Sequence, residues 1–379
     1  MGKNARNAEY TKEYNRKLFL RLLHKESLSR SEIARKMGLT RATTSVIADE
    51  LLQEGFILDS EAGGVHRGRT PVPLSLNPDA CYAVGVYLNR NGCTVGLVDI
   101  CGHLITEKHL LLSGTQKSGK LESLSSTISQ IIEESKIAPA KIVGVGISAP
   151  GPLDGESGLI LNPPRFDLWH NTDICSIIRE RLGIPTYLEN NASCLARYNM
   201  DKPEACGSED FLLLLVDSGV GSGVISRGKL LKGLGYFTSE LGHTTINFRG
   251  KKCECGNIGC LEAYAAIPNL LASTPFSKWE DVIDQFDSNP EAQKLVAAEA
   301  EYLAAGICNI ANLISIDTVL LAGDLLYGID RIAPILEENV NRHTLRRDVL
   351  PISIRAAAAG PNVKVLAAAD IAFGRYLSM

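Results

Sequence analysis

The sequence lacks any long hydrophobic run, because its longest uninterrupted apolar stretch is the six-residue segment Phe211–Val216. A helix that crosses a bilayer needs about 20 mostly apolar residues, so an integral membrane protein is excluded. The first 30 residues also lack the apolar core and the small-residue cleavage pattern of a secretory signal. We therefore expect a cytoplasmic protein without a membrane partner.

The chain also has little net charge, −4 over 379 residues, but this charge is unevenly distributed. Residues 1–48 hold eleven Lys or Arg and four Asp or Glu, a balance of +7, which leaves −11 for the remaining residues. A basic segment on an acidic body predicts a polyanionic partner for that segment alone. The alternative interpretation is a solvated, charged helix face.

The length and the cysteine content limit the number of domains and the chemical state of the cysteines. A chain of 379 residues exceeds a single compact core and predicts two or three domains. Ten cysteines in a cytoplasmic chain are expected to be reduced, so clustered cysteines indicate metal ligands in preference to disulfides.

The basic segment has the pattern of a helix-turn-helix. Apolar residues recur at helical spacing over residues 11–25. A shorter helix is expected over residues 29–37, with Ser31 as its cap and Gly38 as its end. Thr40 then caps a third helix over residues 41–54. Helix, glycine-containing turn and helix is an arrangement typical of DNA-binding domains.

The start of the third helix is predicted to enter the major groove of DNA, where hydroxyl groups and an Arg can contact phosphates and base edges. We expect inward-facing side chains at Val46, Ile47, Leu51 and Leu52. The predicted DNA-binding residues of this helix are Thr40, Arg41, Thr43, Thr44 and Ser45. A three-helix bundle that contacts protein is the alternative.

A wing should follow this helix. Residues 55–57 and 71–76 are predicted strands on either side of a glycine-rich tip that contains Arg67 and Arg69. Two Arg separated by Gly can enter a narrow minor groove. A disordered surface loop is the alternative for the tip.

After residue 77 the pattern changes to an α/β body. A winged helix-turn-helix domain with its linker is expected over residues 1–77, and the body over 78–379. The body is predicted to have two similar lobes, 78–200 plus the C-terminal helix, and 201–360. The strands predicted are 82–88, 94–99, 104–112, 142–147, 186–188, 211–216 and 318–321, and the helices are 121–135, 174–182 and 291–313.

One motif predicts a metal site. His243 is followed after nine residues by Cys253, Cys255 and Cys260. Three thiolates and one imidazole complete a closed tetrahedral zinc site, which leaves no position for a catalytic water. Structural zinc is therefore expected, and three independent buried cysteines are the alternative.

The body, from about residue 80 to the end, resembles the ROK family of repressors and sugar kinases. The most specific resemblance is Glu240-Leu241-Gly242-His243 followed by the cysteine motif and Glu262. The resemblance implies duplicated actin-like ATPase, or ribonuclease H-like, lobes with a sugar between them. It assigns sugar contacts to Asn190, Glu240, His243 and Glu262, and Asn191 is expected to contact the sugar as well.

Arg165 replaces an Asn that is often found in the family's loop over the sugar pocket, here residues 162–169. This cation could contact an acidic or phosphorylated ligand, or it could lie on the surface.

Two kinase elements of the family differ in this chain. The kinase motif Glu-Asn-Asp-Ala, whose Asp is the base, is Glu189-Asn190-Asn191-Ala192 here, and an amide cannot accept the proton. The first phosphate loop, Asp-x-Gly-Gly-Thr, is replaced at residues 87–91, and a triple glycine near the adenosine site by Ala322-Gly323-Asp324. The glycine-rich second loop, residues 218–223, is kept.

These differences predict a sensor without kinase activity, similar to the family's repressors of the xylose-repressor type. The expected partners are operator DNA, a sugar or sugar-phosphate effector, and a second copy in a homodimer or dimer of dimers. One alternative is an active ROK sugar kinase with an appended DNA-binding domain. Another is a regulator that responds to a partner protein.

Overall fold

The computed structural model describes residues 8–59, 73–90, 92–111, 117–205, 207–233 and 239–378. The chain forms two compact units. Unit 1 comprises Met1–Ser148, Ile174–Leu188 and Ala368–Met379, and unit 2 comprises Ala149–Asp173 and Glu189–Ala367. The segments 149–173 and 189–200 therefore lie with the second unit instead of the first lobe. In segment 189–200, α6 (Asn191–Asn199) packs on β12 and β13, and in segment 149–173 Gly151 lies against Glu240 and Arg165 pairs with Glu254. The boundary at residue 77 stays a prediction.

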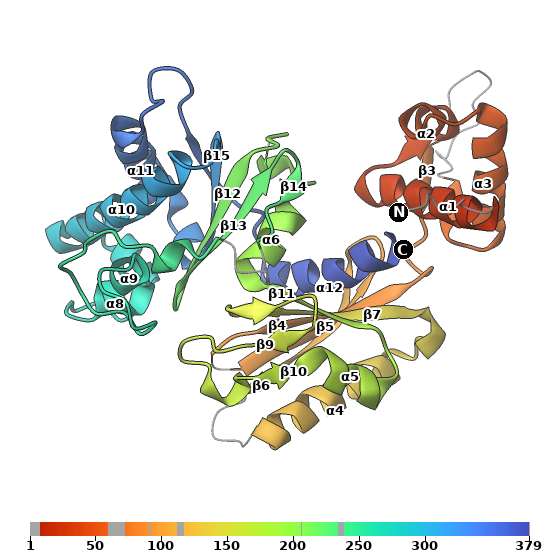
Figure 1. Ribbon diagram of the computed structural model, residues 1–379, viewed down its shortest axis with the longest axis horizontal. Coiled ribbons are helices and arrows are strands. Elements are labelled where there is room, and N and C mark those ends of the chain that lie inside the picture. Colours follow the sequence, from red (N-terminus) through yellow and green to blue (C-terminus); the bar gives the residue numbers. More distant parts are fainter. Residues whose placement is uncertain are drawn as a thin grey trace, which may run out of the picture. The chain divides into compact units, whose positions relative to one another are not determined.

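The N-terminal region of unit 1 is a winged helix. Helices α1 (Ala8–Lys25), α2 (Arg30–Met37) and α3 (Arg41–Gln53) are followed by β2 (Ile57–Asp59) and β3 (Pro73–Leu76). Strand β3 pairs antiparallel with β2 and with β1 (Leu28–Ser29), a short strand that the sequence pattern did not indicate. The predicted helix-turn-helix is confirmed (Figure 1), and two strands follow it, but the first begins at Ile57 and shares only this residue with the predicted strand 55–57.

The cap of α2 is Ser29, and the predicted cap Ser31 is wrong. Ser29 ends β1 and has the extended conformation that a cap requires, φ −71° and ψ 156°. Its hydroxyl accepts from Glu32 N at 3.3 Å, and Ser29 N donates to Glu32 Oε2 at 2.9 Å. This reciprocal pair forms a capping box. At the other end, Gly38 has φ 66°, a left-handed conformation that glycine adopts without steric cost, and it ends the helix as predicted.

Part of the basic charge of residues 1–48 is paired with acidic side chains within the winged helix itself. Lys12 Nζ lies 2.7 Å from Glu50 Oε1, and Arg16 pairs with Glu50 and Glu54, which ties α1 to α3. Arg30 pairs with Asp49 at 2.8 Å. These ion pairs reduce the excess positive charge that is available to a polyanion.

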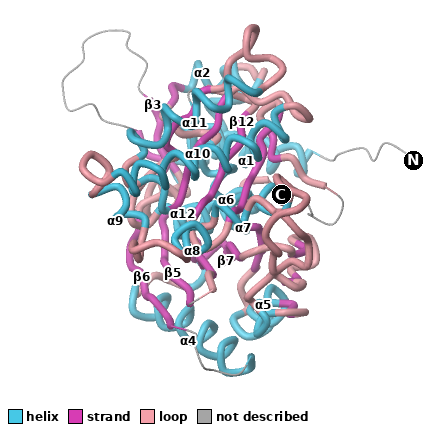
Figure 2. Tube along the Cα trace, turned by 90° about the vertical axis from the view of Figure 1, so that its left-hand side faces the viewer, coloured by secondary structure: helices cyan, strands magenta, loops and turns pink. Residues whose placement is uncertain are grey.

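Unit 1 also contains a five-stranded sheet of order β11-β7-β4-β5-β6. Strands β4 (Tyr82–Leu88), β5 (Gly92–Asp99) and β6 (Leu104–Leu111) form an antiparallel meander, and β7 (Ile142–Ala149) runs parallel to β4. Beside β7 lies β11 (Thr186–Asn190). Helices α4 (Lys117–Ser135) and α5 (Ile174–Leu182) cover one face of this sheet, and α12 (Val363–Tyr376) covers the other (Figures 1 and 2).

Unit 2 repeats this plan in a sheet of order β14-β13-β12-β15-β16. Strands β12 (Phe211–Val216), β13 (Val220–Ser226) and β14 (Lys229–Leu230) form the antiparallel meander. Strands β15 (Thr318–Gly323) and β16 (Ser353–Ala356) extend it in parallel. The predicted duplication of an actin-like lobe is thereby confirmed.

Helices cover both faces of the second sheet. Helix α10 (Pro290–Ala311) packs against α11 (Ile329–His343) on one face, and α6 covers the other. Alternating residues of β12, Leu212, Leu214 and Val216, join the α10 side chains in one buried core. Three short helices, α7 (Glu262–Ala265), α8 (Ile267–Leu271) and α9 (Trp279–Asp284), complete this side.

The segment 149–173 carries a small sheet of β8 (Leu153–Asp154), β9 (Leu159–Ile160) and β10 (Thr172–Asp173). Among the residues that the structure describes, no helix combines the length and the apolar character needed to cross a membrane.

Candidate functional sites

The N-terminal end of α3 presents polar side chains to solvent. Thr40 is the N-cap, and its hydroxyl oxygen accepts from Thr43 N at 3.1 Å. Arg41 and Thr43 are exposed and Ser45 is half-buried. Four of the five predicted residues of this helix therefore remain accessible at its start.

Thr44 is the exception, and the prediction that it faces outwards is wrong. Its side chain is fully buried, and its hydroxyl donates to Thr40 O at 3.0 Å. This bond to the carbonyl four residues earlier satisfies the hydroxyl inside the domain, so the side chain cannot reach a base. Val46, predicted to face inwards, is 57% exposed. The helix is thus rotated relative to the predicted orientation.

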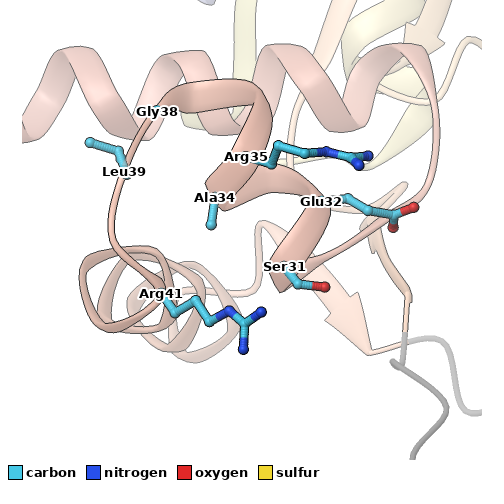
Figure 3. Close-up of a pocket in the computed structure, with 7 residues that line it drawn as sticks. All are labelled: Ser31, Glu32, Ala34, Arg35, Gly38, Leu39 and Arg41. Carbon is cyan, nitrogen blue, oxygen red and sulfur yellow. The ribbon is translucent and has the colours of Figure 1, made fainter.

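A groove of about 480 Å³ runs over the turn between α2 and α3. Figure 3 shows Arg41 extending from the start of α3 in the direction of Ser31, while Arg35 and Glu32 project from α2. Arg35 and Arg41 supply two cations to the lining of the groove, which suits a phosphate group of a DNA backbone. The predicted wing residues Arg67 and Arg69 lie outside the described residues.

In unit 2, the predicted sugar residues gather around Gly151. A Cβ atom placed on Gly151 would lie 2.7 Å from Asn190 Nδ2 and 2.8 Å from Glu240 Oε1. Asn190 is the N-cap of α6, and its Oδ1 accepts from the backbone N–H groups of Ala192 and Ser193. Its oxygen is thus used by the helix, while its amide nitrogen points toward Gly151 and Glu240.

Two carboxylates belong to this cluster. Burial raises the pKa of Glu240, the nearby Glu262 carboxylate raises it further, and His243 opposes the increase. Glu262, the first residue of α7, accepts from Val220 N at 2.9 Å through Oε2. Asn190, Glu240, His243 and Glu262 are therefore brought together in one unit, with amide donors beside carboxylate acceptors.

Asn191 is the first residue of α6 and is buried. Beside it, Glu189 accepts from Asn190 N at 3.2 Å and pairs with Lys232 at 3.1 Å. The sequence did not indicate Lys232, and it indicated Glu189 only as the first residue of the motif Glu189-Asn190-Asn191-Ala192. The Glu189–Lys232 pair joins residues 43 positions apart in the chain, and no local pattern indicates such a pairing.

The retained glycines of residues 218–223 have a packing role. A Cβ atom on Gly223 would lie 2.7 Å from Ala192 O, so β13 can approach α6 only without a side chain there. In the same turn, Asp217 accepts from Lys364 Nζ at 3.3 Å. Burial and the Asp217 carboxylate raise the pKa of Asp324 to about 6. Two carboxylates thus stand beside this turn.

The four predicted metal ligands converge. The nitrogen of His243 and the sulfurs of Cys253, Cys255 and Cys260 all lie within 4.8 Å of one another. Cys255 Sγ and Cys260 Sγ are 3.7 Å apart, and Cys253 Sγ is 3.7 Å from His243 Nδ1. Zinc bonds to sulfur of about 2.3 Å in a tetrahedron place two sulfurs about 3.8 Å apart. The donor set and its spacing therefore fit a zinc ion.

Arg165 lies at the surface of unit 2, where its side chain is 46% exposed. Its guanidinium pairs with Glu254, the residue between Cys253 and Cys255. The sequence did not single out Glu254, because an acidic residue inside a cysteine motif carries no signal about a partner 89 positions away.

Comparison with known proteins places the chain among regulators and kinases of one family. The ROK family profile matches residues 84–374, and the MarR family profile matches residues 17–60. A xylose repressor of Caldicellulosiruptor bescii is 28% identical over an alignment of 382 positions. The alignment covers 93% of this chain and 96% of the relative.

Two solved structures show a similar fold. One, described as a ROK family transcriptional regulator homologous to the E. coli MLC protein, has a TM-score of 0.80 at 21% identity and covers 97% of this chain and 98% of its own. A ROK hexokinase from Thermus thermophilus has a TM-score of 0.65 at 27% identity, and the match covers 78% of this chain and 99% of the hexokinase.

Proposed function

Because the chain belongs to the ROK family, we propose that it is a sugar-responsive transcriptional repressor of carbohydrate-utilisation genes. One observation carries this proposal: a winged helix-turn-helix and a cluster of sugar-binding side chain types occur in the same chain. The similarity to a xylose repressor along nearly the whole chain supports it. The protein would act in the cytoplasm, where its operator lies.

For operator binding, the start of α3 would enter the major groove, with Arg41, Thr43 and Ser45 facing the DNA and Thr40 fixing the helix start. Arg67 and Arg69 would enter the minor groove. A palindromic operator needs two such domains, so a homodimer or a dimer of dimers is the proposed assembly. The cations of the groove in Figure 3 would contact the phosphate backbone.

For effector binding, the carboxylates of Glu240 and Glu262 would accept hydrogen bonds from sugar hydroxyls, and the amides of Asn190 and Asn191 would donate. Cys253, Cys255, Cys260 and His243 would hold a structural zinc ion. Zinc would supply rigidity to the segment that carries His243, which fixes one side of the cluster.

Three features of the chain argue against sugar phosphorylation. Asn191 occupies the position of the base of the family's kinases, and an amide cannot accept a hydroxyl proton. Asp217 and Asp324 place two carboxylates and one cation, Lys364, beside the glycine-rich turn, where a nucleotide would bring phosphates. Asn89 Oδ1 accepts from Gly92 N at 2.9 Å and Asn89 N donates to Gly92 O at 3.0 Å, so Asn89, within the segment that replaces the first phosphate loop, is bonded to the start of β5.

The similarity in fold to a ROK hexokinase keeps one alternative open, an active sugar kinase with an appended DNA-binding domain. Operator binding in a mobility-shift assay with and without D-xylose, D-glucose and N-acetylglucosamine tests the proposal directly. Release of DNA by one sugar, without ATP consumption, is the expected result. Multiple turnovers of ATP per second with that sugar would establish the kinase instead.

Glu262→Gln sharpens this experiment. The substitution removes a carboxylate acceptor from the cluster and leaves the winged helix untouched, so operator binding without sugar should persist while the response to sugar disappears. Loss of operator binding in the absence of sugar would contradict the assignment of Glu262 to the effector site.

A further inference from the structure

Arg165 connects two loops of unit 2 that are far apart in sequence. We name residues 162–169 the effector loop and residues 243–260 the zinc loop. The guanidinium of Arg165 pairs with the carboxylate of Glu254, and Glu254 lies between the two metal ligands Cys253 and Cys255. The inference drawn from this pair concerns the effector site and therefore rests on the proposed function.

The backbone of the effector loop is held by its own contacts. Phe166 N donates to Pro163 O at 3.2 Å, and Trp169 N donates to Phe166 O at 2.9 Å. The rings of Phe166 and Trp169 stack with centroids 5.8 Å apart, and both side chains are buried. Arg165 itself has φ 57°, a left-handed conformation that is unfavourable for a residue with a side chain.

A strained position is maintained only when its surroundings hold it. Within the effector loop, Phe166 and Trp169 anchor the residues that follow Arg165, and the pair with Glu254 connects the Arg165 side chain to the zinc loop. Glu254 in turn is held between two cysteines whose positions a bound metal would fix. A metal that fixes Cys253 and Cys255 would therefore also fix Glu254, and through the ion pair it would restrict the position of Arg165 in the effector loop.

We propose that Arg165 is a positioning residue that fastens the effector loop to the zinc loop, and that the effector is consequently an uncharged sugar. A phosphorylated effector that used Arg165 would have to displace Glu254. Lys232, whose partner Glu189 is adjacent to Asn190, is likewise occupied by an ion pair. Glu240 and Glu262 add two acidic groups, which repel an anion and accept hydrogen bonds from neutral hydroxyls.

Acrylamide quenching of tryptophan fluorescence tests the positioning role without any ligand. The chain has two tryptophans, Trp169 in the effector loop and Trp279 in the core of unit 2, and both are buried, so the variant Trp169→Phe is needed to assign a change in quenching to Trp169. Arg165→Ala and Glu254→Ala should each increase quenching, and the double variant should increase it no further. Exchange of the two charges in R165E/E254R should restore the original value, and removal of the metal by a chelator should raise quenching as the single variants do.

Two controls accompany this measurement. In a Trp169→Phe background, Arg165→Ala should no longer increase the quenching. Arg342→Ala, which removes a similarly exposed ion pair with Glu338 on α11, should leave the quenching at the wild-type value. Quenching that stays unchanged in R165A and E254A, or after removal of the metal, would overturn the positioning role.

Binding of D-xylose, D-glucose and D-glucose 6-phosphate, measured by calorimetry, tests the effector class. An exposed ion pair contributes modestly, so R165A and E254A should each weaken binding of the neutral sugar by about two- to fivefold. The opposite pattern would overturn the proposal: E254A tightens binding of the phosphate because Arg165 is released, while R165A abolishes it. If none of the sugars in the mobility-shift assay releases the protein from DNA, the proposed function is refuted. The quenching experiment uses no sugar, so its result decides the role of Arg165 in either case.

Discussion

At the scale of single residues, the position of Arg41 illustrates the DNA-binding interpretation. It occupies the first turn of α3, directly after the cap Thr40, and it lines the groove between α2 and α3. A side chain in this position can reach both a phosphate and the edge of a guanine. Its contribution to operator binding should therefore be large compared with that of the half-buried Ser45.

Replacement of Arg41 by Ala should weaken operator binding by about 1 to 3 kcal/mol if the side chain contacts a base. Thr44→Val is the matched control, because Thr44 is fully buried three residues away and Val has a similar shape. We expect the control to change the melting temperature more than the affinity. Fluorescence anisotropy with a labelled operator measures both variants, and equal affinities for R41A and wild type would remove Arg41 from the DNA-contacting residues.

Glu299 is a second single residue that leads to a prediction, because its carboxyl group is buried in the core of unit 2. It lies on the inner face of α10 with no exposed surface, and neither of its carboxylate oxygens has a hydrogen-bond partner among the residues that the structure describes. Burial raises the pKa of Glu299 well above its ordinary value. The native state therefore favours the protonated acid.

A raised carboxyl pKa makes the folded state less stable as pH increases from the ordinary value toward the raised one, because only the unfolded chain ionises freely. Glu299→Met removes this penalty and should stabilise the protein, with a gain in melting temperature that grows from pH 5 to pH 8. Glu301→Gln, an exposed position on the same helix, should show no such trend. A gain for E299M that is constant with pH would refute the explanation.

At the scale of elements, the zinc loop illustrates how glycine and backbone hydrogen bonds organise a segment that lies between helices. Gly259 has φ 76°, and a Cβ atom there would lie 1.7 Å from Asn247 O, so only glycine permits this approach. Ile246 N donates to Gly259 O at 2.8 Å, and Cys253 N donates to Asn257 O at 2.8 Å. These backbone bonds bring the four metal ligands together.

Cys255→Ser should lower the zinc content, measured by plasma emission spectrometry, from about one ion per chain to well below it. The melting temperature should fall as well, because metal binding stabilises the folded loop. Cys308→Ser is the control, since Cys308 lies on α10 outside the cluster. A wild-type protein that is fully folded, free of metal and responsive to sugar would contradict the zinc proposal.

At the scale of the whole molecule, α12 contributes residues to both units. In unit 2, Lys364 of this helix pairs with Asp217. In unit 1, Asp370 Oδ1 lies 3.3 Å from His24 Nε2 of α1, and Arg21 Nη2 donates to Leu377 O at 3.1 Å. His24 Nδ1 also lies 2.8 Å from Ile100 O. The winged helix and the C-terminal helix are thus in direct contact within unit 1.

This contact should carry the response of the operator-binding domain to the sugar. His24→Ala should leave operator affinity without sugar and sugar affinity nearly unchanged, but it should reduce the coupling between them, which typically amounts to about 1 to 3 kcal/mol. Operator affinity measured at several sugar concentrations gives this coupling. His109→Ala on the exposed face of β6 is the control. A wild-type response in H24A would exclude this route.

The sequence by itself determined the features that depend on neighbouring residues. The helical spacing of α1, the Thr40 cap of α3, the apolar runs of β4 and β12 and the cysteine motif are local patterns, and the structure contains each of them. Local hydrogen bonds and side-chain periodicity suffice to specify these elements. The roles of Asn190, Asn191, Glu240 and Glu262 were predicted only through the family resemblance.

Tertiary structure alone decided the features that depend on distant residues. The rotation of α3, which buries Thr44 and exposes Val46, follows from how α3 packs against α1 and α2. Ser29, and not the predicted Ser31, is the cap of α2, because Ser29 ends the strand β1. Strand β1 pairs with β3, which follows more than 40 residues later. The partners of Arg165, Lys232 and Lys364 are likewise far away in the chain. Such contacts arise only when folding brings separate segments together, so no local pattern of residues encodes them.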